Sequence, residues 1–330
     1  IKPSNNLNKN TINIDGTLSS QYVTGLIIAF SMLKANNEDI NYTVKIDGEE
    51  TSCGFIKMTL DMLESFGIKT ISENKNITIS EIKKVRDDYN VEGDATTASY
   101  LFGWSYLNKF NLKIPNLKLK SVQPDTNVLI KMLKHFGKLE EESDGLFFEP
   151  YDCIKLDNYN FDLDSSDTFL TWGCLLILEN KLIEISNIKN QNWKECARID
   201  KFIENIEKLG GKCEKTEDGF KIVKGLTSIE KNVVIETHKD HRLAMSFSLV
   251  SIKHDNVLIM NPHCVNKTYP KYWEDIKQLN IDIIPLNKSS LKTITLIGMP
   301  GSGKTTLAKE VGDKLSLCCM DIDNLVINDI

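Results

Sequence analysis

The stretch DHRLAMSFSLV at residues 240–250 places three polar residues directly before a long apolar run. A run that is apolar on all sides predicts a helix that is buried on all sides. Three further stretches share this pattern: SSQYVTGLIIAF at 19–30, TTASYLFGW at 96–104 and SDTFLTWGCLLIL at 166–178. The sequence therefore predicts four buried helices, each beginning with polar groups.

A second kind of helix alternates with these four. Amphipathic segments end at Gly67, Gly137, Gly210 and Asn280, at intervals of about 70 residues. Glycine and asparagine are the residues that best tolerate the left-handed position after a helix. Short strand-like runs such as GLFFEP at 145–150 follow. The chain is thus predicted to be an α/β protein built from repeated units, each with one buried helix, one amphipathic helix and several strands.

Composition sets the broad class. The chain has 330 residues, of which 41% are hydrophobic and 26% charged, as in ordinary globular proteins with two or three domains. The net charge of −6 argues against a nucleic-acid partner. No apolar run is long enough for a membrane span. Eight scattered cysteines without metal-ligand spacing indicate reduced thiols in a cytoplasmic protein. The first residue, Ile1, and the abrupt end lead us to expect a fragment of a longer chain.

The polar starts of the buried helices are candidate site residues. A helix N-terminus carries unpaired N–H groups and about half a positive charge, so it attracts anions. Each start also has a simpler interpretation: Ser19 and Asp167 are ordinary capping residues. The cluster KDHR at 239–242 is harder to explain as plain surface. Four such helix starts facing one cleft would form a site for doubly charged anions.

Two other segments carry charged candidates. Lys194 and Arg198 in KECAR have the i, i+4 spacing of one helix face, where a surface ion-pair face is the alternative interpretation. Lys267 in NKTYP, taken alone, is an ordinary solvated lysine.

In this order, the segments SSQ (19–21), EGDATTASY (92–100), KEC-R, DHRLAMSF and NKTYP resemble 5-enolpyruvylshikimate-3-phosphate (EPSP) synthase over about residues 10–285. The KEC-R motif most resembles the version of the enzyme that forms part of the pentafunctional arom polypeptide. The resemblance implies inside-out α/β lobes of three repeats each, with sheets outside and helices within. Residues 1–92 would belong to one lobe, and residues 93–287 would form the second.

The resemblance also implies an activity. EPSP synthases transfer the enolpyruvyl group of phosphoenolpyruvate to the 5-hydroxyl of shikimate 3-phosphate without a metal or other cofactor. By this match Asp167 is the general base and Glu195 the acid, with Lys194 also at the reacting groups. Shikimate 3-phosphate would be held by Ser19, Ser20, Gln21, Ser52, Asn190 and Lys194. Phosphoenolpyruvate would be held by Arg198, Arg242 and Lys267, because guanidinium groups bind such anions with two parallel hydrogen bonds.

The chain departs from the family pattern at several positions. Phe55 stands where relatives carry a substrate-contacting tyrosine, Ala197 where a polar residue is frequent, and Asn192 where many have arginine. The family's first third, with its own lysine and arginine site residues, would precede Ile1. We therefore expect the 330 residues alone to be inactive.

The stretch TITLIGMPGSGKTT at 293–306 combines an apolar strand, a glycine-rich turn and the start of a helix. This is the context of a nucleotide phosphate-binding loop. It resembles the start of shikimate kinase, at 292–330 after a linker at 285–292. ATP would then be bound by Gly298, Gly301, Ser302, Gly303, Lys304, Thr305 and Thr306. Thr305 and Asp321 would bind Mg²⁺, and Asp323 would contact shikimate.

Two alternatives stay open at this point. UDP-N-acetylglucosamine enolpyruvyl transferase shares the architecture but uses a nucleotide sugar, and the SSQ segment argues against it. A binding module without catalysis, carrying a phosphate-binding loop, is the second alternative; retention of Asp167 and Glu195 disfavours it. A homodimer of the longer parent is an option that the sequence leaves open.

Overall fold

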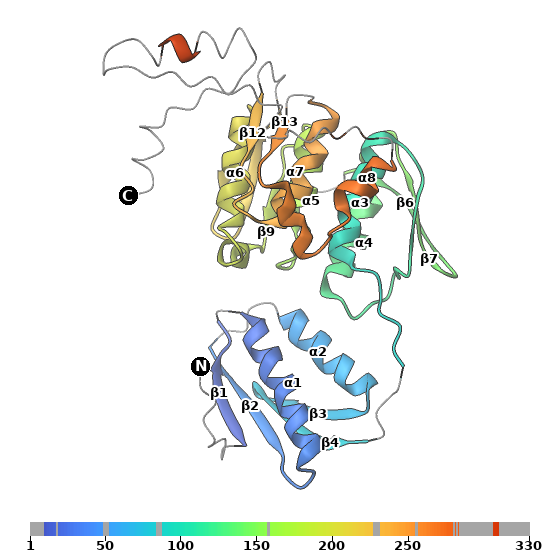
Figure 1. The fold of residues 1–330 in the computed structure, drawn as a ribbon, viewed down its shortest axis with the longest axis vertical. Helices are drawn as coiled ribbons and strands as arrows, with labels where there is room; N and C mark the ends of the chain where they lie inside the picture. The colour runs from blue at the N-terminus through green and yellow to red at the C-terminus, as the bar shows by residue number, and fades with distance from the viewer. Residues whose placement is uncertain are drawn as a thin grey trace.

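The computed structural model describes residues 10–17, 19–48, 53–83, 88–156, 159–226, 232–254, 257–279, 281, 283 and 306–309. Within these residues the chain forms two bodies, the smaller one first in sequence (Figure 1). Each body has its own hydrophobic core. The connection between them runs from the end of β4 at Ile82 to the start of α3 at Ala95.

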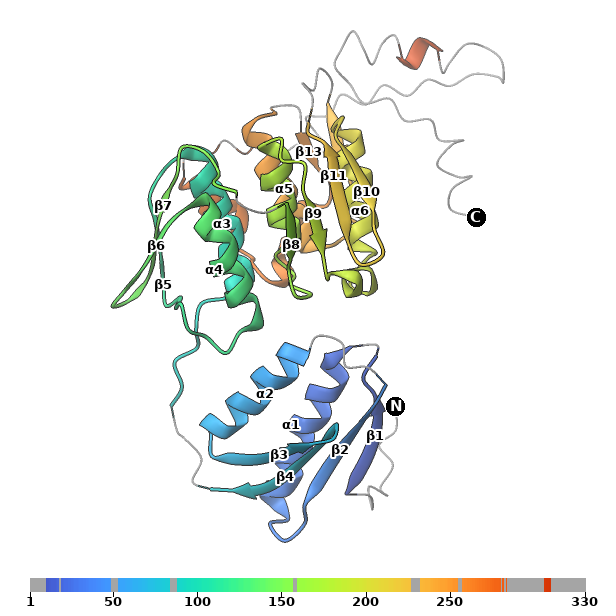
Figure 2. The same ribbon diagram turned by 180° about the vertical axis from the view of Figure 1, so that it is seen from behind.

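The smaller body is a four-stranded sheet with two helices on one face (Figures 1 and 2). Its sheet has the order β1-β2-β4-β3; β1 and β2 are parallel and the other pairs antiparallel. Val23 and Ile27 of α1 are fully buried against the sheet because they lie four residues apart on one helix face. The elements are β1 (Thr11–Asp15), α1 (Ser20–Asn36), β2 (Tyr42–Asp47), α2 (Cys53–Ser65), β3 (Ile68–Glu73) and β4 (Asn76–Ile82).

The larger body places helices α3, α5 and α7 between three sheets, of orders β5-β7-β6, β8-β9-β11-β10 and β12-β13 (Figures 1 and 2). Its α-helices are α3 (Ala95–Asn108), α4 (Pro124–Phe136), α5 (Phe169–Leu178), α6 (Arg198–Lys208), α7 (His241–Ser248) and α8 (Tyr272–Lys277). Its strands are β5 (Leu112–Pro115), β6 (Gly137–Glu142), β7 (Gly145–Pro150), β8 (Asn160–Asp162), β9 (Glu184–Ser186), β10 (Lys212–Lys215), β11 (Phe220–Lys224), β12 (Val233–Ile235) and β13 (Val257–Ile259). Its 3-10 helices are η1 (Lys189–Trp193), η2 (Leu249–Ile252) and η3 (Pro262–Lys267).

The predicted repeat is confirmed by the strand topology. The sheet β8-β9-β11-β10 has the same order and strand directions as β1-β2-β4-β3: one parallel pair followed by two antiparallel pairs. A helix connects the two strands of each parallel pair: α1 lies between β1 and β2, α5 between β8 and β9, and α7 between β12 and β13. The same unit therefore recurs along the chain.

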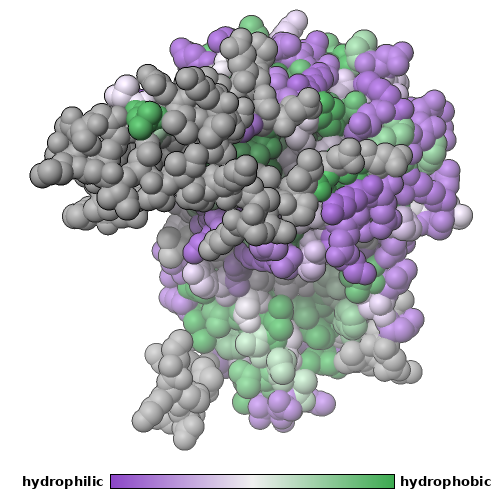
Figure 3. Space-filling view, turned by 45° about the horizontal axis from the view of Figure 1, so that its top comes forward, coloured by the Kyte–Doolittle hydropathy of each residue, from purple (hydrophilic) through white to green (hydrophobic). Residues whose placement is uncertain are grey.

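The prediction that the four polar-start helices are buried holds for α3, α5 and α7, most of whose residues are buried, and is wrong for α1. Every residue of α5 is buried. In α1, by contrast, Tyr22, Ile28 and Met32 are 60%, 50% and 67% exposed. One side of α1 covers its sheet, and no described element covers the other side. The visible face of the smaller body is accordingly rich in apolar side chains (Figure 3).

The helix-terminating glycines are not all equivalent. Gly67 and Gly210 adopt the predicted left-handed conformation, with φ of 82° and 78°. The prediction is wrong for Gly137, whose φ of −172° is extended because strand β6 begins at this residue. Position 137 needs a glycine for a different reason: a side chain would clash there, because its Cβ would lie 2.4 Å from the Glu149 carbonyl oxygen. Asn280 lies outside the described residues.

The C-terminal region is described only at residues 306–309, which are helical. Thr306 is among them, whereas the predicted linker at 285–292, the rest of the glycine-rich turn, Asp321 and Asp323 lie outside the described residues. In the part of the chain that the structure covers, none of the helices has both the length and the apolar character that a bilayer crossing needs.

Candidate active site

A cavity of about 400 Å³ lies where the two bodies meet. The smaller body contributes Ser20, Gln21, Thr24, Phe55, Met58 and Thr59, and the larger body contributes Asp94, Thr96, Gln123, Pro124, Asp125, Asp167, Lys194 and Arg242. Five side chains that the sequence predicted for one site, far apart along the chain, therefore line one cavity: Ser20, Gln21, Asp167, Lys194 and Arg242.

Three of the helices that begin at this cavity are capped by a side chain. The Ser19 hydroxyl accepts a hydrogen bond from the Gln21 N–H (3.2 Å) at the start of α1. Asp94 caps α3 by accepting from the Thr96 N–H (2.8 Å), and Asp240 caps α7 by accepting from the Arg242 N–H (2.8 Å). The remaining N–H groups of these first turns give the cavity a positive potential that suits anions.

Asp167 is not a helix cap. Helix α5 begins two residues later, and its N-cap residue Thr168 makes no side-chain capping bond. The Asp167 carboxylate instead forms an ion pair with Arg242 (2.8 Å) and accepts hydrogen bonds from Arg198 (3.0 Å) and Gln191 (2.8 Å). Burial alone would raise the pKa of Asp167, but Arg242, Arg198 and Lys194 outweigh it and lower the pKa to about 2. The carboxylate is therefore ionised at neutral pH and able to accept a proton.

Arg198 is the centre of a buried ion-pair network. Its side chain is 1% exposed and contacts the carboxylates of Asp167, Glu195 and Asp240, with Nε 2.7 Å from an Asp240 oxygen. The predicted i, i+4 helix face with Lys194 is wrong. Lys194 follows the 3-10 helix η1, and α6 begins only at Arg198. The chain turns between the two residues, so Lys194 reaches the cavity while Arg198 points into the protein.

Glu195 extends the network away from the cavity. Its carboxylate contacts Arg198 on one side and Lys267, at the end of η3, on the other. Burial would raise the pKa of Glu195, but Arg198 and Lys267 lower it to about 2. Glu195, Arg198 and Lys267 are not among the residues that line the cavity.

The ion-pair network around Arg198 predicts that the free energy of unfolding depends on pH. The pKa values of Asp167 and Glu195 are depressed in the folded protein, so the stabilisation is present above pH 5 and is lost as pH falls from 5 to 2. We expect each carboxylate to contribute on the order of 2 kcal/mol. Urea unfolding of wild type and Glu195→Gln at pH 6 and pH 3 tests this. The variant should lose less stability than wild type between the two pH values; equal losses would contradict the assignment.

Other predicted residues lie elsewhere or outside the described part. Asn190 is buried in η1. Ser52 lies outside the described residues, as do Lys304 and Thr305. Among the residues that the structure describes, no group of three or more His, Cys, Asp and Glu side chains is arranged to hold a metal ion.

Sequence reasoning missed Asp125, which lines the cavity and is only 6% exposed. Asp125 lies in the first turn of α4, where an acidic residue is expected merely to complement the helix dipole. The sequence did contain one signal for Asp125. Its carboxylate lies on the buried face of an amphipathic helix, the face that also carries Thr126, Leu129 and Leu133.

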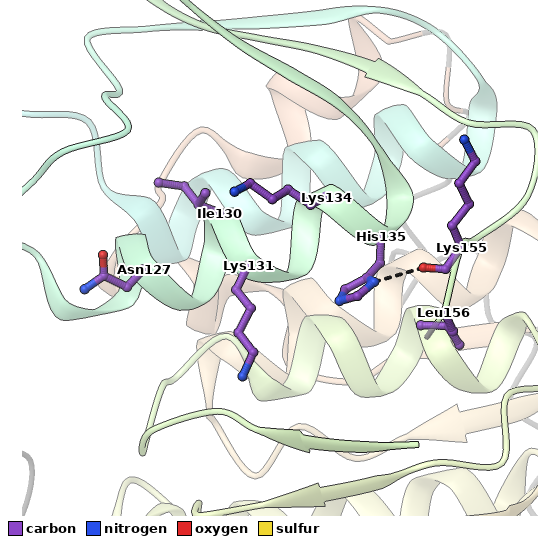
Figure 4. Close-up of a pocket in the computed structure, with 7 residues that line it drawn as sticks. All are labelled: Asn127, Ile130, Lys131, Lys134, His135, Lys155 and Leu156. Atoms are coloured by element: carbon purple, nitrogen blue, oxygen red, sulfur yellow. Dashed lines mark hydrogen bonds between the residues drawn. The ribbon is translucent and has the colours of Figure 1, made fainter. Parts of the chain in front are cut away.

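A second, larger hollow of about 650 Å³ lies on the outer side of α4. It is lined by Asn127, Ile130, Lys131, Lys134, His135, Lys155 and Leu156. Figure 4 shows that the three lysines point in different directions. Lys131 donates to the Asp162 carbonyl (3.0 Å), and the Lys155 ammonium lies over the Tyr151 ring. These cations do not converge on one point, so we place the candidate site in the cavity between the bodies.

Comparison with known proteins indicates the family. The family model for EPSP synthase (3-phosphoshikimate 1-carboxyvinyltransferase) matches residues 1–276. A pentafunctional AROM polypeptide of Pneumocystis carinii is 31% identical over 97% of this chain, which covers 22% of that protein. A 3-phosphoshikimate 1-carboxyvinyltransferase of Clostridium beijerinckii is 30% identical over 84% of this chain, which covers 63% of that enzyme.

The fold gives an independent comparison. The structure of an EPSP synthase from Acinetobacter baumannii superposes with a TM-score of 0.61 at 18% identity, over 81% of this chain and 62% of the other. The chain thus spans less than two thirds of the length of these relatives. By the match over most of its residues, this chain belongs to the EPSP synthase (3-phosphoshikimate 1-carboxyvinyltransferase) family.

Proposed function

We propose that the protein transfers the enolpyruvyl group of phosphoenolpyruvate to the 5-hydroxyl of shikimate 3-phosphate in the cavity between its two bodies. The observation that carries the proposal is that Ser20, Asp167, Lys194 and Arg242 line one cavity at the starts of three helices. Both substrates are anions, and this cavity offers cations and helix N-termini. Family membership favours this reaction over that of a nucleotide-sugar transferase.

The chemistry needs one base and one acid. Asp167, ionised at neutral pH, accepts the proton of the 5-hydroxyl, whose oxygen bonds to C2 of phosphoenolpyruvate. Because the Glu195 carboxylate is ionised at neutral pH, it first takes up a proton from solvent. It then gives that proton to the methylene carbon, which becomes a methyl group. The tetrahedral adduct then loses phosphate by cleavage of its C–O bond. The ionised Glu195 takes back a proton from the methyl group, which restores the double bond. Ser19, Ser20, Gln21, Ser52, Asn190 and Lys194 are the proposed ligands of shikimate 3-phosphate.

Phosphoenolpyruvate binding is proposed for Arg242, Lys267 and Arg198. Arg242 lines the cavity and is 15% exposed, so part of its guanidinium is open to a ligand. Lys267 is paired with Glu195. A substrate anion that draws Lys267 away would remove a cause of the depressed pKa of Glu195, making that carboxyl a better proton donor.

Phosphate release tests the proposal. The natural full-length protein that carries this chain should release phosphate from phosphoenolpyruvate only when shikimate 3-phosphate is present. Calorimetry should show that shikimate 3-phosphate binds and that shikimate, which lacks the phosphate, binds far more weakly. Phosphate release that does not depend on shikimate 3-phosphate, or none at all, would refute the assignment. The same assay on the 330-residue chain tests our expectation that it is inactive alone.

Phe55 allows a gain of affinity to be predicted. Its ring lines the cavity at the position where relatives carry a tyrosine. Phe55→Tyr should restore one hydroxyl contact and lower the Kd for shikimate 3-phosphate about fivefold, because a hydrogen bond contributes about 1 kcal/mol net. Calorimetry measures this change directly. Met58→Leu, in the same cavity wall but without a new polar group, serves as control, and an unchanged Kd in Phe55→Tyr would show that the tyrosine hydroxyl finds no partner here.

A second proposed function rests on the segment GMPGSGKTT at 298–306 and on similarity to the AROM polypeptide over 97% of the chain. We propose that residues 292–330 begin an ATP- and Mg²⁺-dependent shikimate kinase. Lys304→Ala in the full-length protein should abolish ATP-dependent phosphorylation of shikimate while enolpyruvyl transfer continues. Loss of both activities, or of neither, would count against a separate kinase domain.

A further inference from the structure

Asp125 joins three elements through one buried carboxylate. Its Oδ2 accepts a hydrogen bond from the Thr96 hydroxyl at the start of α3, at 2.6 Å. Its Oδ1 accepts one from the Ser166 hydroxyl, also at 2.6 Å, in the segment before α5. Asp125 itself lies in the first turn of α4 and is 6% exposed. The side chain therefore connects the starts of α3 and α4 to the residue next to Asp167.

The segment around Asp167 depends on this connection. The Ser166 hydroxyl lies 2.7 Å from the Thr168 hydroxyl and accepts a hydrogen bond from the Thr168 N–H (3.1 Å). The Thr168 hydroxyl in turn accepts from the Trp172 indole N–H (2.8 Å). The two neighbours of Asp167 are thus held by one chain of hydrogen bonds that ends on Asp125. Arg198 and Arg242 fix the carboxylate of Asp167, whereas this chain fixes its backbone.

An aspartate is an unusual residue at a buried position such as 125. Burial raises its pKa, and the nearby negative charge of Asp167 raises it further, while the hydroxyls of Ser166 and Thr96 act in the opposite direction. A buried carboxylate beside another carboxylate is costly unless its hydrogen bonds are satisfied. The proposed reaction assigns no proton transfer to Asp125, so its role is to be sought in its contacts.

We propose that Asp125 is a positioning residue that holds the segment Ser166–Thr168, and with it Asp167, against the starts of α3 and α4. The inference rests on the proposed role of Asp167 as the base. Because a misplacement of about 1 Å lowers a rate roughly a hundredfold, loss of this positioning should lower kcat strongly while substrate binding changes little. A direct substrate contact by Asp125 is the competing explanation, and it would instead raise the KM for shikimate 3-phosphate.

The experiment compares Asp125→Ala with Asp125→Asn in the full-length protein. Alanine removes both acceptors, and its kcat should fall at least about thirtyfold with both KM values within about threefold of wild type. Asparagine keeps an oxygen for Ser166 and an amide for Thr96, so its kcat should stay within about threefold. Glu141→Gln, on the exposed face of β6, is the control and should behave as wild type.

Amide hydrogen exchange gives a readout that needs no activity. The Thr168 amide, which donates to Ser166, should exchange at least about tenfold faster in Asp125→Ala than in wild type and in Asp125→Asn. If Asp125→Ala does not fold, Thr96→Val takes its place in both measurements, because it removes one hydroxyl partner of Asp125 and leaves the Ser166 acceptor of the Thr168 amide intact.

The outcomes separate the two proposals. An Asp125→Ala protein with wild-type kcat, with a raised KM at unchanged kcat, or with unchanged Thr168 exchange would overturn the positioning role. If the wild-type protein shows no turnover, the proposed function fails. Exchange at Thr168 then decides alone whether Asp125 holds the segment.

Discussion

Replacing Arg198 with alanine should lower the free energy of unfolding of the larger body by about 3–5 kcal/mol, because it leaves buried carboxylates without their counter-charge. The guanidinium is 1% exposed and pairs with Asp240, which is fully buried, and with Asp167 and Glu195. Removing one partner of a buried ion pair costs far more than the pair itself contributes. Urea unfolding at pH 7, followed by circular dichroism, measures the loss.

A surface ion pair provides the matched control. Lys208 and Glu236 lie 3.0 Å apart with both side chains well exposed, so Lys208→Ala should cost less than about 1 kcal/mol. An Arg198→Ala protein that loses no more than this control would show that the carboxylates rearrange to reach water, and that the network is not the fixed structure we describe.

Replacing Asp167 with asparagine should reduce turnover about 10²- to 10⁴-fold, the usual contribution of a general base. Asparagine preserves the size of the side chain but cannot accept the proton of the 5-hydroxyl. It also removes the charge that pairs with Arg242, at 2.8 Å in the structure. Phosphate release by the full-length protein measures the effect, with saturating shikimate 3-phosphate and phosphoenolpyruvate so that kcat is compared.

The control for this variant is Asp164→Asn. Asp164 is exposed, lies three residues earlier, and has a φ of 45° that asparagine tolerates as well as aspartate. It should turn over like wild type. If Asp167→Asn retained more than about a tenth of wild-type turnover, another group would have to accept the proton, and the assignment of the base would be wrong.

The helices of the larger body could be predicted because their signals are local. A ten-residue apolar run such as residues 169–178 is typical of a buried helix, since buried strands are usually shorter, and its polar start indicates where the helix begins. The interval of about 70 residues between the ends of the amphipathic helices indicated a repeated unit without any knowledge of the strands. The exposed face of α1 could not be predicted in this way, because an apolar pattern does not show which neighbours are present.

The ion-pair network around Arg198 could not be predicted from the sequence, for a different reason. The i, i+4 rule for Lys194 and Arg198 holds only inside a helix, and here the chain leaves η1 before α6 begins. Asp125 was hidden because an acidic residue in the first turn of a helix is ordinary. Its contacts are with Thr96 and Ser166, which lie 29 and 41 positions away in the sequence. Contacts between residues so far apart cannot be predicted from a local sequence pattern.

By itself the sequence determined the α/β class, the repeated unit, the polar starts of the helices and the family, because these depend on short segments and their order. The tertiary structure alone decided that Ser20, Asp167, Lys194 and Arg242 share a cavity, and that Arg198 lies among three carboxylates. The physical reason is that burial and charge pairing depend on distances across the fold, and packing sets those distances.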